Sequence, residues 1–178
     1  MVSQAVVTPS SWKSYLELCK PNVVAEMLFT TLVGMLLAVP GMPPLDKLGF
    51  GLLGIALAAA SAAAINHLID QKIDGVLNPH RPLPKHYLKS SEVITFAAAL
   101  GIASMILLML KVNLLTAFLT FVSLFGYAIV YTVWLKRATP QNIVIGGAFG
   151  ATPPLLGWCA ITGSIHPHAL LLVLIIFV

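Results

Sequence analysis

The stretch LGFGLLGIALAAASAAAINHLIDQKID, residues 48–74, decides the fold of this 178-residue chain. From Leu48 to Ile69 it carries no Asp, Glu, Lys or Arg, and it is long enough to cross a hydrocarbon core about 30 Å thick as a helix. Small residues fill positions 58–64, and such residues let helix backbones approach closely in lipid. The stretch therefore predicts a membrane-spanning helix in the middle of a bundle.

The rest of the chain has the same apolar character. Hydrophobic residues make up 58% of it and charged residues 9%, whereas a soluble domain carries about a quarter charged residues. The mean hydropathy is +0.95. We predict an all-α, polytopic membrane helical bundle with about six transmembrane helices present, the fifth interrupted by a Gly-rich and Pro-broken segment at 146–154. The expected spans are 23–39, 48–69, 93–110, 114–135, 143–161 and one that opens near 168.

Basic residues are distributed unevenly between the two sides of these spans. Cytoplasmic loops carry an excess of Lys and Arg, so residues 1–20 are predicted to be a cytoplasmic tail, and only Lys47 and Lys111 fall outside. The formal net charge of +4 is then explained by membrane topology, and we expect no nucleic-acid partner. The basic residues expected inside are Lys13, Lys20, Lys72, Arg81, Lys85, Lys89, Lys136 and Arg137.

Two of the chain's 6 acidic residues, Asp70 and Asp74, follow the apolar part of the 48–74 stretch. Asn66 precedes Asp70 by one helical turn, so the three side chains share one helical face at i, i+4 and i+8. Such oxygen ligands suit Mg²⁺, which is commonly shared between one or two carboxylates and a substrate phosphate. The spacing predicts a cytoplasm-facing magnesium and diphosphate site, and the open alternative is a pair of solvated helix-end carboxylates.

Basic residues close behind the acidic cluster favour the diphosphate site. Arg81, Lys85 and Lys89 follow Asp74 within a short polar segment that is punctuated by proline. Cationic side chains beside a metal-loaded carboxylate pair are what phosphate oxygens require.

Four further polar residues lie in or beside the predicted spans. Glu26 is costly in lipid, so we expect it to face the bundle or a cavity, as a substrate-binding group or as a structural partner. His67 is either a ligand contact or a residue of helix packing or of a pH-dependent hydrogen bond. Tyr127 and Tyr131, one turn apart, either face a central cavity or belong to an interfacial aromatic belt.

Four sequence segments resemble a known family. They are NHLIDQKID (66–74), RPLP (81–84), YTVWLKRATPQNIVIGG (131–147) and PPLLGW (153–158). Together they are similar to the UbiA superfamily of intramembrane prenyltransferases, and the last two are similar to its haem-modifying branch in particular. The resemblance runs from about Tyr15 to the last residue, so residues 21–178 are expected to form a UbiA-like transmembrane domain.

The resemblance implies a reaction and roles for the site. Asp70 and Asp74 would bind Mg²⁺ that bridges farnesyl diphosphate, and Asn66 would complete that face. A vinyl group of haem B would attack the allylic cation, and water would complete the hydroxyethylfarnesyl group. The expected setting is the lipid bilayer of a bacterial inner membrane, with haem A synthase or terminal-oxidase assembly as a further partner. The side chains expected to hold phosphate oxygens are Arg81, Lys85, Lys136 and Arg137.

Two departures from the family pattern leave other functions open. The segment from Gly75 to His80 is about two residues shorter than in the family, and family members have about nine spans with a second acidic cluster in their C-terminal half. We therefore expect a C-terminally truncated chain with half of an active site. The alternatives are a quinone-type aromatic prenyltransferase, a small-solute transporter and a non-catalytic membrane protein.

Overall fold

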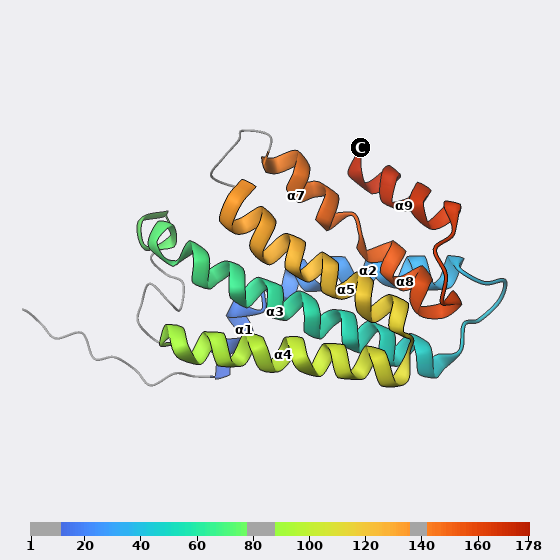
Figure 1. Ribbon diagram of the computed structural model, residues 1–178, viewed down its shortest axis with the longest axis horizontal. Coiled ribbons are helices and arrows are strands. Elements are labelled where there is room, and N and C mark those ends of the chain that lie inside the picture. The colour runs from blue at the N-terminus through green and yellow to red at the C-terminus, as the bar shows by residue number, and fades with distance from the viewer. Residues whose placement is uncertain (1–11, 78–87, 136–141) are drawn as a thin grey trace, which may run out of the picture.

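The computed structural model describes residues 12–77, 88–135 and 142–178, and within these ranges every regular element is a helix (Figure 1). The side chains of 72–77, 133–135, 142, 143 and 145 lie outside the described part. The predicted all-α membrane bundle is confirmed. Its helices are α1 (Trp12–Leu18), α2 (Pro21–Leu37), α3 (Leu45–Leu77), α4 (Ser90–Lys111), α5 (Leu114–Phe125), the π-helix η1 (Gly126–Leu135), α7 (Asn142–Gly150), α8 (Pro153–Thr162) and α9 (Pro167–Phe177).

Three described helices are long and apolar enough to cross a membrane, over Leu45–Gln71, Ser90–Lys111 and Leu114–Thr132. A fourth span is formed if α1 and α2 count together across their 51° bend. The predicted interruption of the fifth stretch is confirmed, because α7 ends at Gly150 and α8 begins at Pro153. The sixth stretch is the short apolar helix α9.

The 48–74 stretch lies at the centre of the bundle, as predicted. Helix α3 packs against α1, α2, α4, α5, η1 and α8, and α4 lies alongside much of its length (Figure 1). The expected span 48–69 lies within α3, which continues through the acidic motif to Leu77. Nothing between Asp70 and Leu77 prevents helical backbone, and the first proline comes only at Pro79. Asn66, Asp70 and Asp74 therefore stand on continuous helix.

A short helix, α1, lies within residues 1–20, which the sequence predicts to be a cytoplasmic tail. Leu18 of α1 is fully buried in a cluster with Ala64 of α3 and Val93 of α4, and Tyr15 packs against the same cluster. This packing fixes α1 on the bundle and places the junction between α1 and α2 beside the last turns of α3.

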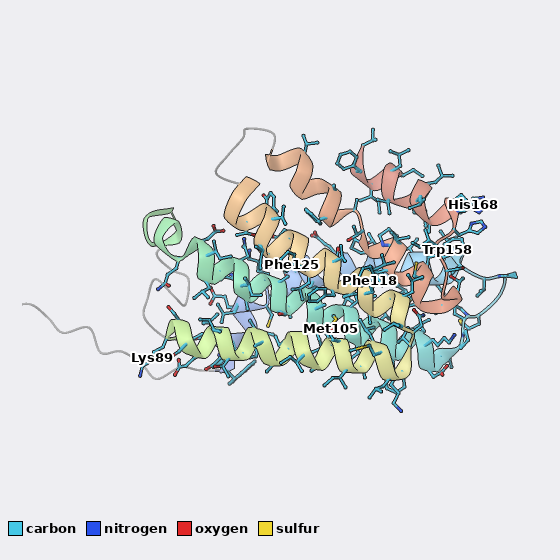
Figure 2. All side chains as sticks on the ribbon, viewed as in Figure 1. Lys89, Met105, Phe118, Phe125, Trp158 and His168 are labelled. Carbon is cyan, nitrogen blue, oxygen red and sulfur yellow. The ribbon has the colours of Figure 1, made fainter. Side chains whose placement is uncertain are left out.

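The described loops gather at two ends of the bundle (Figure 1). Helix α3 ends and α4 begins at one end, where Figure 2 labels Lys89, and the α8–α9 turn with Trp158 and His168 lies at the other. The acidic motif is therefore at the end that the distribution of basic residues predicts to be cytoplasmic.

Candidate functional site

Asn66 and Asp70 form a buried polar pair on α3. Their side chains are only 4% and 5% exposed, and Asn66 Nδ2 donates a hydrogen bond to Asp70 Oδ2 over 3.2 Å. The α3 backbone continues helically to Leu77, so Asp74 stands one turn further on the same face, although its side chain lies outside the described part. The predicted shared face is thus present in the backbone, and its first two side chains are in contact.

Lys20 supplies a positive charge to this pair from the junction between α1 and α2. Its Nζ donates a hydrogen bond to Asn66 Oδ1 over 2.6 Å. The Lys20 backbone has φ 48° and ψ 64°, the left-handed conformation that non-glycine residues rarely adopt. Such backbone is uncommon outside functional sites, and here it directs a cation toward the Asn66–Asp70 pair.

The π-helix η1 supplies the third side of the site. Thr132 is fully buried, and its Oγ1 accepts a hydrogen bond from Asn66 Nδ2 over 3.4 Å. The same hydroxyl donates to the Tyr127 carbonyl oxygen over 2.8 Å. π-Helical turns are rare and occur frequently at functional sites. Here the wider turn places Thr132 against the Asn66 amide, so that both polar ends of Asn66 have partners.

A cavity of about 350 Å³ extends into the bundle beside this polar cluster. Tyr127 joins the two, since it lines the cavity and its carbonyl oxygen accepts the hydrogen bond from Thr132. Ala58, Ala59 and Ala62 of α3 form part of the wall, and small side chains there leave room for a ligand. The lining is mainly apolar, with polar groups concentrated on a few residues, as is typical of small-molecule sites.

The structure places some of the other residues singled out from the sequence. Glu26 and Tyr127 line the cavity, as predicted, and Tyr131 stacks on Tyr127 with 5.4 Å between ring centroids. His67 is 4% exposed within α3. The predicted phosphate-binding residues lie outside the described part of the chain; they are Arg81, Lys85, Lys136 and Arg137.

Sequence analysis missed two residues of the site, Lys20 and Thr132. Lys20 is singled out in the sequence only as one of the basic residues of the cytoplasmic side, and Thr132 lies in an apolar run with no distinctive spacing. A lysine at the start of the first span was the available signal for Lys20. No comparable signal marks Thr132, because its role depends on the π-helical turn.

The chemistry of the donor set fits a hard divalent cation. The described residues contain no group of three His, Cys, Asp or Glu side chains that could hold a metal ion. Asp70 is nevertheless a buried carboxylate beside an amide, and Asp74 follows it on the same helical face. Carboxylate oxygens of this kind suit Mg²⁺, whose remaining positions are commonly filled by water and phosphate oxygens.

Comparison with known sequences gives a consistent result. Residues 27–178 match the UbiA prenyltransferase family. A protein of Methylococcus capsulatus named protoheme IX farnesyltransferase is 59% identical over 170 residues, which are 94% of this chain and 57% of that protein. A protein of the same name from Saccharophagus degradans is 63% identical, over 94% of this chain and 56% of its own length. The chain thus spans a little more than half the length of these relatives.

Solved structures share the fold. A digeranylgeranylglyceryl phosphate synthase superposes with a TM-score of 0.83 at 23% identity, over 93% of this chain and 58% of its own. A UbiA homologue from Archaeoglobus fulgidus bound to GPP and Mg²⁺ superposes with a TM-score of 0.76 at 22% identity, over 92% and 60% of the two chains.

Proposed function

This chain belongs to the UbiA prenyltransferase family, and from that membership we propose that the complete gene product transfers the farnesyl group of farnesyl diphosphate to a vinyl group of haem B. The observation that carries the proposal is a buried carboxylate, Asp70, hydrogen-bonded to Lys20-bound Asn66. Asn66 stands one helical turn after Ala62, which is part of the wall of an apolar membrane cavity. Relatives named protoheme IX farnesyltransferase, 59% and 63% identical, support haem as the acceptor.

The polar cluster is suited to a diphosphate. Asp70 and Asp74 would hold Mg²⁺, which the related protein from Archaeoglobus fulgidus binds together with GPP. When bound, the metal would neutralise charge on the departing pyrophosphate. Lys20 holds the Asn66 amide in place and brings a second positive charge to the same point. Four residues outside the described part would contribute further cationic groups, since they follow α3 and η1 in the sequence, the helices that carry Asp70 and Thr132. They are Arg81, Lys85, Lys136 and Arg137.

The cavity is suited to the isoprenoid chain. Its apolar lining can surround a hydrocarbon, and the three alanines of α3 allow that chain to lie close to the helix backbone. Tyr127 lines this cavity, and its aromatic face would stabilise an allylic cation formed beside it. The N-terminus would be cytoplasmic, and the membrane-bound product would pass to haem A synthase or to terminal-oxidase assembly.

Acceptor choice tests the proposal directly. Membranes containing the complete gene product, with Mg²⁺ and radiolabelled farnesyl diphosphate, should transfer label to haem B and leave 4-hydroxybenzoate unlabelled. Organic extraction and chromatography of the products measure both reactions in one assay. Label on 4-hydroxybenzoate and none on haem would assign the chain to quinone-type prenyl transfer instead.

Lys20→Met is expected to weaken prenyl diphosphate binding, because it removes a charged hydrogen bond from the Asn66 side chain. Hydrogen bonds to charged groups contribute about 1.5–3 kcal/mol, so the KM for farnesyl diphosphate should rise roughly 10- to 100-fold. Lys20→Arg should recover part of the loss.

Lys13→Met is the matched control for this prediction. Lys13 lies on the neighbouring short helix α1 and is exposed, so its removal should leave KM unchanged. Equal KM values for Lys20→Met and the unchanged protein would show that Lys20 does not contribute to binding of farnesyl diphosphate.

A further inference from the structure

The cavity stops short of the end of the bundle that holds the α8–α9 turn. Along α3 its lining ends at Ile55, and none of the described residues of α3 before Ile55 contributes to it. Three other helices also leave the cavity before they reach that end of the bundle. Their deepest lining residues are Thr30 of α2, Thr120 of α5 and Leu156 of α8.

Buried apolar side chains fill the bundle beyond this depth. Ile55 and Leu156 line the cavity and also belong to a hydrophobic cluster whose members are at most 6% exposed. Helices α2 and α8 cross there with backbones in contact, because a Cβ at Gly157 would meet the carbonyl oxygen of Thr31. Ile55 and Leu156 therefore form a packed end wall that has little room to recede. The other cluster members are Met35, Ala160 and Ile161.

The α3 face between the polar cluster and the end wall is lined only by alanine. Ala58, Ala59 and Ala62 leave space beside the helix, and Ile55 is the first large side chain. At 1.5 Å per residue, Ile55 stands about 16 Å from Asn66 along the α3 axis. An extended carbon chain advances about 1.2 Å per bond, as an extended peptide backbone does, so three isoprene units span about 14 Å and four about 19 Å.

We propose that the end wall, Ile55 and Leu156, sets the length of the prenyl chain and so selects farnesyl over geranylgeranyl diphosphate. This inference rests on the proposed function, which supplies a diphosphate held at Asp70. The prenyl chain extends from there along the alanine face of α3 and ends against Ile55. A fourth isoprene unit would have to displace buried side chains, and even one excess methylene in an apolar pocket costs about tenfold or more in discrimination.

Chain-length preference can be measured without haem and without turnover. Thiolodiphosphate analogues of farnesyl and geranylgeranyl diphosphate, which resist cleavage, are added with Mg²⁺ to the complete protein in detergent. Each raises the midpoint of thermal unfolding according to its affinity. The unchanged protein should bind the farnesyl analogue about tenfold more tightly or better, and Ile55→Ala should reduce this preference by roughly tenfold because it opens the end wall.

Ile161→Ala is the matched control for Ile55→Ala. Ile161 belongs to the same buried cluster and is 6% exposed, but it does not line the cavity. The change removes the same atoms and a similar amount of packing, so it should lower stability and leave the chain-length preference unchanged. A folded Ile55→Ala protein with the preference of the unchanged protein would overturn the proposal.

Ala58→Leu tests the same wall from the opposite direction, and it decides the question if Ile55→Ala does not fold. Ala58 lines the cavity one turn before the end wall is reached from Asn66, so leucine there should shorten the available space. Binding of the farnesyl analogue should weaken about tenfold or more, whereas the geranyl analogue, one isoprene unit shorter, should bind as before. Ala56→Leu, on α3 but outside the cavity lining, is the control. Unchanged binding of both analogues to Ala58→Leu would contradict a length limit set at this depth.

The outcomes separate this inference from the proposed function. A preference that Ile55→Ala or Ala58→Leu changes, in a protein that does not prenylate haem, would support length selection and overturn haem as the acceptor. Haem prenylation with a preference that neither variant changes would support the proposed function and overturn the role of the end wall. Failure of the unchanged protein to bind any of the analogues would overturn both.

Discussion

Asp70→Asn is expected to lower prenyl transfer by roughly a thousandfold while the protein still inserts into the membrane. A bound divalent cation supplies several kcal/mol of charge stabilisation to a transition state, and about 4 kcal/mol corresponds to a thousandfold in rate. Asparagine keeps the shape of the side chain and can accept from Asn66 Nδ2, but it removes the negative charge that would hold the metal. The buried position of Asp70, 5% exposed, means that little solvent screens this charge.

Asp46→Asn is the matched control for Asp70→Asn. Asp46 is an exposed residue in the first turn of α3, the same helix, at the end away from the polar cluster. Its change should leave turnover unchanged. Turnover is measured as label transferred to haem, and insertion as the yield of monodisperse protein after detergent extraction. Retained turnover in Asp70→Asn would show that the Asp70 charge does not hold a metal ion needed for prenyl transfer.

Asp74→Asn should have the same effect as Asp70→Asn, because both aspartates are proposed to hold the metal from one helical face. The two changes should be non-additive, since the loss of either ligand already disables the shared site. Additive losses in the double variant would assign the aspartates to separate roles.

The sequence predicted the acidic face because that face depends only on helical periodicity. Asn66, Asp70 and Asp74 are one turn apart, so any helix through them aligns them, wherever the helix ends. The apolar run ends at Ile69, and the helix continues past it to Leu77, because polar residues do not stop a helix as proline does.

The partners of Asn66 could not be predicted in this way. Lys20 lies 46 residues away and Thr132 lies 66 residues away, so both contacts depend on how α2 and η1 pack against α3. The π-helical turn is a further obstacle, because an apolar stretch such as 114–135 reads as regular helix whether or not it contains a wider turn. Sequence periodicity thus predicts which side chains share a helical face, and tertiary packing determines which residues of other helices contact them.

Gly157→Ala is expected to destabilise the bundle more than any other single methyl addition on α8. A Cβ at Gly157 would meet the carbonyl oxygen of Thr31 on α2, and a Cβ at Gly34 of α2 would meet the carbonyl oxygen of Pro154 on α8. The two helices therefore cross with backbones in contact, as small residues permit in membranes. Backbone atoms cannot rotate away as a side chain can, so the cost should be about 3 kcal/mol or more.

Gly49→Ala separates this clash from the general effect of adding a methyl group. A Cβ at Gly49 of α3 would meet nothing within 4 Å, and alanine favours helix over glycine by about 1 kcal/mol. Gly49→Ala should raise the midpoint of thermal unfolding in detergent, whereas Gly157→Ala should lower it by roughly 6–12 °C. Equal midpoints for Gly157→Ala and the unchanged protein would show that α2 and α8 do not cross in contact.

The same crossing also sets the width of the cavity. Helix α2 contributes Glu26 and Thr30 to its lining, and α8 contributes Leu156, the residue before Gly157. A methyl group that separates the two helices must move these walls apart, because Leu156 and Gly157 belong to one helical turn. Gly157→Ala should therefore lower prenyl transfer even in the fraction that remains folded. A folded Gly157→Ala protein with full turnover would show that the cavity wall tolerates this displacement, and the α2–α8 crossing would then serve stability alone.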